Sequence, residues 1–165
     1  MKIIDENIIA PNAIIAIVIS RFNIFINKNL LCATIDTLQR TGMVQKKNIT
    51  ICWVPGSYEI ASVIKLLIQK NFYDGIIAIG TIIKGKTSHF KYLSQEVCSQ
   101  ISNLSIKNNI PVSFGILTTN NIEQAIERSG IKVNRGAEAA LTLLEMINIF
   151  KSIQLIKKKD TKEVK

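Results

Sequence analysis

The sequence contains a single histidine, His89, which lies in the stretch GTIIKGKTSHF at residues 80–90. An apolar run that is typical of a strand precedes this stretch, and lysine and hydroxyl residues surround the imidazole. A histidine can give and take protons near neutral pH, which suits general acid–base catalysis. A lone histidine is often only structural, so its neighbours decide between the two interpretations. One histidine and three scattered cysteines cannot assemble the usual ligand set of a metal site, and we expect no metal.

The turn that follows this strand has the composition of an anion site. Gly85, Lys86 and Thr87 come directly before a predicted helix, where free backbone N–H groups attract negative charge and glycine permits close approach. Arg128, at the end of IEQAIERSG, could clamp a phosphate with two hydrogen bonds, although an exposed arginine at a helix end is common. These residues favour a phosphate site close to His89.

Four apolar runs predict the strands that must position these residues, at 13–19, 48–54, 74–80 and 111–117. A helical pattern follows each of them. Alternating strands and helices indicate an α/β domain with a parallel sheet covered on both faces, a three-layer α/β/α sandwich. The helices are predicted at residues 27–42, 57–70, 89–108, 121–130 and 134–153.

The four turns after the strands should form one rim, because ligands of such sheets bind beyond the carboxyl ends of the strands. The turns are SRFN, PGSYE, TIIKGKTSH and TTN. Their aromatic, hydroxyl, carboxylate and imidazole groups suit a planar polar ligand with a hydroxylated arm. Phe22 either stacks on a planar ring or plugs a loop. Glu59 either accepts hydrogen bonds from ligand hydroxyls or only complements the dipole of its helix.

Two segments predict association with other copies of the chain. The helix at residues 57–70 is apolar around almost its whole circumference, which is typical of a helix buried on all sides. An outer helix of a three-layer domain should have a polar face toward solvent, so we expect a homo-oligomer with an interface at this helix. The segment KIIDENIIA has no helix of its own and is expected to pair at a sheet edge of a neighbouring subunit.

Length and charge place further bounds on the chain. Its 165 residues fit one domain, predicted at residues 1–156, followed by a lysine-rich tail at 157–165 that we expect to be disordered. The net charge is +9, and the tail leaves nucleic-acid binding open as an alternative function. The longest apolar run is too short to span a bilayer, the N-terminus lacks a signal-peptide pattern, and the three cysteines suggest no disulfide framework. We therefore expect a cytoplasmic protein without a membrane partner.

The segments SRFN, VPGSYEI, YDGIIAIGTIIKGKTSHF, PVSFGILTTNNIEQAIERSG and NRGAEAALTLLEMIN resemble, in order and spacing, the lumazine synthase family. The resemblance covers about residues 10–155 and implies a flavodoxin-like fold. It implies an enzyme that condenses 5-amino-6-(D-ribitylamino)uracil with 3,4-dihydroxy-2-butanone 4-phosphate to 6,7-dimethyl-8-ribityllumazine, the penultimate step to riboflavin. Phosphate and water are released, with no metal and no organic cofactor. It also implies sites between subunits of a homopentamer, which in many members builds a sixty-subunit shell associated with riboflavin synthase.

The resemblance also implies a role for each matching residue. The residues that hold the pyrimidine and its ribityl arm would be Phe22, Ser57, Tyr58, Glu59, Thr81, Ile82, Ile83 and Phe114. The residues that hold the ketone phosphate would be Lys86, Thr87 and Arg128, with Arg135 as a further residue on the phosphate side. His89 matches the proton-transfer residue. Phe114 and Arg128 would come from the neighbouring subunit.

Three positions depart from the family pattern. Lys91 stands where the family usually has an acid after His-Phe, Arg135 replaces a usual lysine, and the loop IKVNRG is one residue shorter than its common form. Lys91 places a cation in the first turn of a helix, against the helix dipole, and we expect a slower enzyme. The short loop leaves pentamer and shell open. A catalytically degraded scaffold that keeps the fold is a further alternative.

Overall fold

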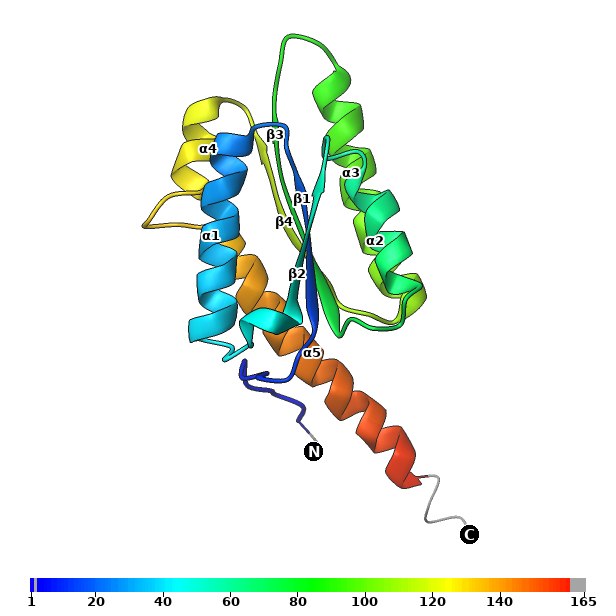
Figure 1. Cartoon of the computed structure of the whole chain (residues 1–165). Coiled ribbons are helices and arrows are strands. Elements are labelled where there is room, and N and C mark those ends of the chain that lie inside the picture. Colours follow the sequence, from blue (N-terminus) through cyan, green and yellow to red (C-terminus); the bar gives the residue numbers. More distant parts are fainter. Residues whose placement is uncertain (2, 161–165) are drawn as a thin grey trace.

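The central layer of the protein is a sheet of four parallel strands in the order β2-β1-β3-β4 (Figure 1). The computed structural model describes Met1 and residues 3–160. β1 and β3 lie in the middle of the sheet and consist almost entirely of buried residues. They are rich in isoleucine because a parallel sheet is covered on both faces. The strands are β1 (Ile15–Ser20), β2 (Ile49–Val54), β3 (Gly75–Ile83) and β4 (Val112–Thr119).

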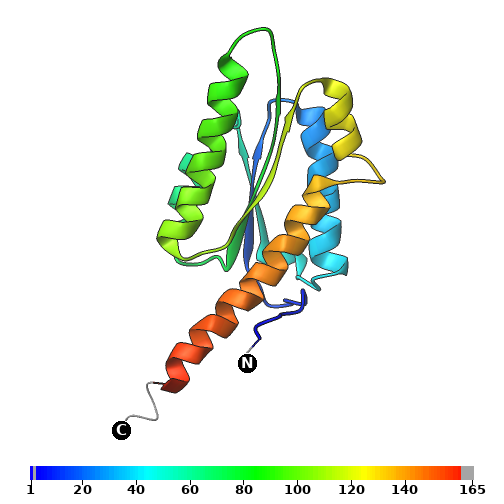
Figure 2. The same ribbon diagram turned by 180° about the vertical axis from the view of Figure 1, so that it is seen from behind.

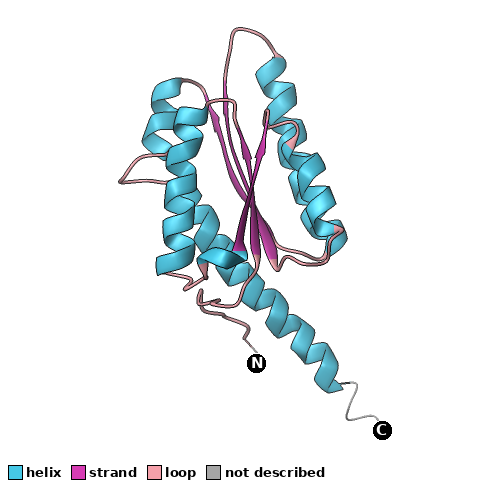
Figure 3. Cartoon of the chain, in the orientation of Figure 1, coloured by secondary structure: helices cyan, strands magenta, loops and turns pink. Residues whose placement is uncertain are grey.

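Helices cover both faces of the sheet, so the predicted three-layer α/β/α fold is confirmed (Figures 2 and 3). α1 and α5 pack on one face, and α2 and α3 pack on the other. α4 lies beside α1 near the end of β4 (Figure 1). A short 3-10 turn, Lys46–Asn48, leads into β2. The helices are α1 (Ile24–Arg40), α2 (Ile60–Ile68), α3 (His89–Asn108), α4 (Ile122–Arg128) and α5 (Arg135–Asp160).

Alternate residues of β1 belong to two separate hydrophobic cores, one on each face of the sheet. Ile15, Ile17 and Ile19 belong to the core shared with α1 and α5. Ala16 and Val18 belong to the core shared with α2 and α3. This alternation follows from the strand geometry, in which successive side chains point to opposite faces. The sheet is therefore held rigidly from both sides, and its carboxyl edge can carry a precise site.

The N-terminal segment, residues 3–14, carries no helix or strand and lies along α5 (Figure 1). The Asn148 side chain of α5 donates hydrogen bonds to the carbonyl oxygens of Asn7 at 2.7 Å and Ile9 at 3.1 Å. Ser152 donates a further hydrogen bond to the carboxylate of Glu6. Pairing of this segment with a neighbouring subunit stays a prediction.

Several predicted element ends differ from the structure, among them those of β3 and α5. β3 continues to Ile83, three residues past its predicted end at Gly80, because it stays in register with β4 as far as the pair Ile83–Thr119. The Lys84 N–H then donates to the Thr119 carbonyl at 2.8 Å. α5 continues to Asp160, into the range predicted as a tail, and residues 161–165 of that tail lie outside the described residues.

Within the described residues, one helix is long and apolar enough to cross a membrane by length and composition. It is the part of α5 at Arg135–Ile156, with a mean hydropathy of 1.4. Its buried residues pack against the sheet and α1, and they are Ala139, Ala140, Leu143, Leu144 and Ile147. Part of its apolar character thus belongs to the core. The expectation that the chain has no membrane partner stays a prediction.

The α2 helix is less enclosed than its sequence predicts for a helix buried on all sides. Ile60 and Ile64 are fully buried against the sheet, whereas Leu66 on the outer side is 61% exposed. A single exposed leucine is common on protein surfaces, so the interface expected at α2 stays a prediction.

Candidate active site

A cavity of about 490 Å³ opens at the carboxyl ends of β1, β2 and β3. This is the edge at which a parallel α/β sheet normally binds its ligand. The structure brings together here residues from three of the four predicted turns and from the first turns of α3. The lining residues are Phe22, Gly56, Ser57, Tyr58, Thr81, Ile82, Ile83, Gly85, Thr87, His89, Phe90 and Leu93.

The turn after β1 presents an aromatic ring at the cavity mouth. The Arg21 N–H donates to the Val54 carbonyl at 2.8 Å, and the Phe22 N–H donates to the Pro55 carbonyl at 3.1 Å. These bonds fix the backbone of the turn against the end of β2. The Phe22 side chain remains 71% exposed, although it lines the cavity. An exposed ring on a fixed backbone is well suited to stack on a planar ligand.

The turn after β2 contributes one buried hydroxyl and one exposed aromatic ring. Ser57 is buried and Tyr58 is 65% exposed, and both line the cavity. A Cβ atom at Gly80 would lie 2.8 Å from Ser57 Oγ, so only glycine lets this turn approach the end of β3 so closely. Glu59 does not line the cavity, and its carboxylate instead accepts a hydrogen bond from the Gly56 N–H at 3.0 Å.

The end of β3 supplies Thr81, Ile82 and Ile83 to the cavity wall. They were predicted to lie in a turn, but the pairing with β4 keeps them in a strand, which is a more rigid support. Thr81 is 1% exposed, and its hydroxyl donates to Asn27 Oδ1 at 2.7 Å. This wall is therefore a preformed surface.

The predicted anion turn is exposed and leads directly into α3. Gly85 has open space around its Cα, with nothing within 4 Å of a built Cβ atom, so a ligand can reach the backbone. The His89 N–H donates to Thr87 Oγ1 at 3.4 Å, and both side chains line the cavity. Lys86 is exposed but does not line the cavity of the single chain. Free N–H groups at the start of a long helix make this end a suitable place for a phosphate.

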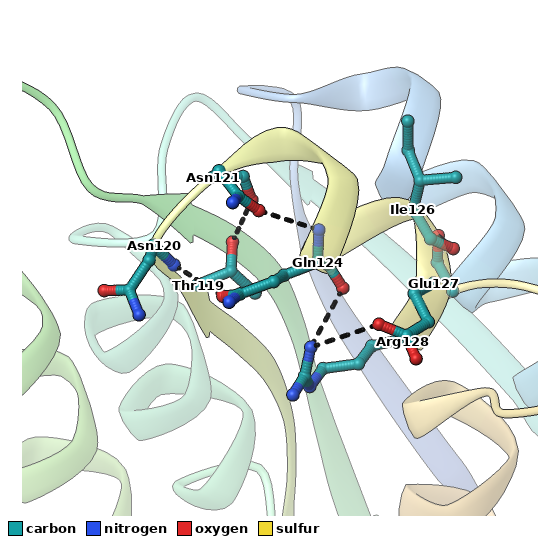
Figure 4. Close-up of polar contacts among 8 residues, drawn as sticks. Thr119, Asn120, Asn121, Gln124, Ile126, Glu127 and Arg128 are labelled. Carbon is teal, nitrogen blue, oxygen red and sulfur yellow. Dashed lines mark hydrogen bonds and ion pairs between the residues drawn. The ribbon is translucent and has the colours of Figure 1, made fainter.

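Phe114, Arg128 and Arg135 lie outside the cavity of their own chain. Phe114 is 41% exposed on β4, an edge strand of the sheet. Arg128 ends α4, where its Nη1 donates to the Gln124 carbonyl at 3.3 Å and lies 3.9 Å from a carboxylate oxygen of Glu127 (Figure 4). Arg135 forms an ion pair with Glu138 in the first turn of α5.

Lys91 is exposed in the first turn of α3. Among the ion pairs of the described residues, none involves Lys91. Its ammonium group therefore stays in solvent close to the N-terminus of the helix, where positive charge is disfavoured. The expectation that this residue slows the enzyme stays a prediction.

Two asparagines that sequence reasoning missed organise the cavity wall. Asn23 has a left-handed backbone (φ 60°), and its side chain donates to the Thr81 carbonyl at 2.8 Å. Asn27 is fully buried and bonds both the Phe22 carbonyl and the Thr81 hydroxyl. The available signal was the position of Asn27, four residues before Leu31 on the apolar stripe of α1, where a polar residue is unexpected.

Comparisons with known proteins relate this chain to one family. A family model described as 6,7-dimethyl-8-ribityllumazine synthase matches residues 12–151, a range that contains every residue lining the cavity. A protein named 6,7-dimethyl-8-ribityllumazine synthase from Yersinia pestis (strain Pestoides F) is 52% identical over 155 residues, which cover 93% of this chain and 99% of the relative. A protein of the same name from Yersinia pseudotuberculosis serotype O:1b (strain IP 31758) has the same identity and coverage.

Proposed function

The chain belongs to the 6,7-dimethyl-8-ribityllumazine synthase family, and we propose that the cavity at the carboxyl edge of its sheet is the substrate site of that reaction. The protein is a transferase of riboflavin biosynthesis. It condenses 5-amino-6-(D-ribitylamino)uracil with 3,4-dihydroxy-2-butanone 4-phosphate and releases phosphate and water. The observation that carries the site assignment is that an exposed aromatic ring, buried hydroxyls and the only imidazole line one cavity.

The pyrimidine fits the half of the cavity between the first and third turns. Phe22 stacks on the ring from the mouth, and Thr81, Ile82 and Ile83 meet its edge. Ser57, Tyr58 and Glu59 hold the ribityl arm, for which Glu59 exchanges its bond to the Gly56 N–H for bonds to ligand hydroxyls. The rigidity of β3 supports this assignment, because a flat ring needs a wall that does not move.

The ketone phosphate fits the other half, at the start of α3. The exposed backbone at Gly85 and the side chains of Lys86 and Thr87 surround its phosphate, which the helix N-terminus also attracts. The amine of the pyrimidine substrate attacks the ketone and loses water to form a Schiff base. Phosphate then leaves, the resulting enol rearranges, and the ribityl-bearing nitrogen closes the ring with loss of a second water. His89 carries protons between these steps.

Replacing His89 with alanine is expected to slow the enzyme without abolishing its activity. Most of the rate acceleration comes from holding the two substrates together. Because His89 is exposed, water can transfer part of the protons when the imidazole is absent. We expect kcat to fall on the order of tenfold to a hundredfold, with both KM values little changed. Steady-state kinetics at saturating substrates measure this. A complete loss of turnover with substrate binding intact would contradict it.

We further propose that a neighbouring subunit completes each site in a homopentamer. Arg128 and Phe114 support this, because both are partly exposed yet lie outside the cavity of their own chain. We also propose that pentamers assemble into a sixty-subunit shell and that the shell associates with riboflavin synthase. Sedimentation of the purified protein, alone and mixed with riboflavin synthase, would test both proposals. The free thiols of Cys32, Cys52 and Cys98 support a cytoplasmic location.

Mixing two inactive or weakened variants is expected to restore activity if sites are shared. His89→Ala removes a group from one side of the interface, and Arg128→Ala removes a group from the other. In oligomers reassembled from equal amounts, about one quarter of the sites combine two unaltered sides. The mixture should therefore exceed the mean of the two parent activities at low ketone phosphate. Simple averaging of the parents would indicate that both groups act within one chain.

The function itself is tested by combining the purified chain with both substrates and following the absorbance and fluorescence of the lumazine. Formation of the chromophore, dependent on both substrates and on protein concentration, is the expected result. An assembled protein that forms no lumazine would indicate the degraded scaffold instead.

A further inference from the structure

A buried asparagine in the first turn of α1 joins two walls of the cavity through its side chain. Asn27 is fully buried, and its Nδ2 donates to the carbonyl oxygens of Ser20 and Phe22, both at 2.8 Å. Nδ2 also lies 3.0 Å from Ser20 Oγ. On its other side, Asn27 Oδ1 accepts from Thr81 Oγ1 at 2.7 Å. Both polar atoms of the amide are thus bonded to the ends of β1 and β3.

These bonds complement the backbone bonds of the same turn. The Phe22 N–H is tied to the β2 side of the cavity through the Pro55 carbonyl at 3.1 Å. On the β3 side, the turn is held by side chains, namely Asn27 and the Asn23 amide that donates to the Thr81 carbonyl at 2.8 Å. Of the two, Asn27 bonds the Phe22 carbonyl itself. Asn27 therefore holds, from the β3 side, the backbone from which the Phe22 ring projects.

A polar side chain at this position is costly unless it is fully bonded, since most of the other buried residues of α1 are apolar. Its bonds run to the cavity walls and not to its own helix. We propose that Asn27 is a positioning residue for the pyrimidine substrate, holding the Phe22 turn and the Thr81 end of β3 at the separation that encloses a flat ring. This inference rests on the proposed function, in which these two residues contact the pyrimidine.

The same helix provides a matched control at Thr34. Thr34 is also fully buried and polar, but its hydroxyl donates to the Leu30 carbonyl at 2.8 Å, within α1. Thr34 lies beside Gly136 of α5 and does not line the cavity. A substitution there tests the stability of α1 without moving the cavity walls.

The test compares Asn27→Ala with Thr34→Ala by steady-state kinetics and thermal unfolding of the purified oligomer. For Asn27→Ala we expect the KM for the pyrimidine substrate to rise about tenfold, while the KM for the ketone phosphate changes by less than about twofold. For Thr34→Ala we expect a lower unfolding temperature and unchanged KM values. Equal rises of both KM values in Asn27→Ala, or no rise at all, overturn the proposal.

A second pair of variants decides the matter if Asn27→Ala does not fold. Thr81→Val removes the hydroxyl that bonds Asn27, and Thr81→Ser keeps it. A higher KM for the pyrimidine in Thr81→Val, rescued in Thr81→Ser, supports the proposal, and equal behaviour of the two overturns it. If the wild-type protein forms lumazine while the two variants behave equally, the inference about Asn27 fails and the proposed function stands. If the wild type forms none, the proposed function and this inference fall together.

Discussion

Replacing Arg128 with alanine is expected to raise the KM for the ketone phosphate about a hundredfold, with a small effect on the KM for the pyrimidine. A guanidinium group can bond a phosphate with two charge-assisted hydrogen bonds, each stronger than a bond between neutral groups. Within the described part of the chain, the Arg128 side chain is 40% exposed, and its polar contacts are a 3.3 Å bond to the Gln124 carbonyl and a 3.9 Å approach to the Glu127 carboxylate. It can leave these contacts for a ligand at little cost.

The expected selectivity separates a phosphate clamp from a general loss of assembly. Initial rates are measured while each substrate is varied at saturation of the other. Arg40→Ala is the matched control, because Arg40 is an exposed arginine at the end of α1 that pairs with Asp36 at 3.5 Å. It should leave both KM values unchanged. Equal rises of the two KM values in Arg128→Ala would argue against a clamp.

Replacing Gly136 with alanine is expected to destabilise the domain by about 3 kcal/mol or more. A Cβ atom at this position would lie 2.2 Å from the Leu30 carbonyl oxygen and 2.8 Å from Thr34 Oγ1. The first clash is with the backbone of α1, so it cannot be relieved by a side-chain rotation. α5 would have to move away from α1, and the core between them would loosen.

Thermal unfolding at a fixed subunit concentration measures this effect, since association also shifts the transition temperature. We expect Gly136→Ala to unfold roughly 10 °C below the wild type. Gly85→Ala is the control, because a Cβ atom there has no neighbour within 4 Å, and its transition should stay within about 2 °C. A wild-type transition for Gly136→Ala would show that the contact between α1 and α5 can adjust.

Local sequence signals predicted the element order and several boundaries. The helix expected at residues 89–108 is α3, which has the same limits because its end is marked locally by Asn109 with a left-handed backbone (φ 50°). The end of β3 was predicted too early, because its last three residues are strand only through their pairing with β4. Such pairing involves residues distant in the sequence, and a local pattern cannot show it.

The cavity was more predictable than the arrangement that supports it. Phe22, Ser57 and His89 follow strand ends, and a parallel sheet brings all such positions to one edge. The sequence marks Asn27 only as a polar residue on the apolar stripe of α1, and its role depends on which atoms it meets in the folded chain. Arg128 was predicted to reach the phosphate from a neighbouring subunit, and its position outside the cavity of its own chain leaves that a prediction, because one chain does not show the geometry across an interface.

The position of α5 in chain order has a consequence for folding during synthesis. The core on the α2 and α3 face is composed of residues up to Ile116, whereas the core on the other face needs Ala139 to Ile147 of α5. A chain emerging from the ribosome can therefore close one face of the sheet while α1 still lacks its cover. The N-terminal segment is synthesised first but finds its partners late, because Asn148 and Ser152 of α5 bind it. We therefore expect the apolar face of α1 that packs against α5 to stay exposed in nascent chains until α5 is synthesised.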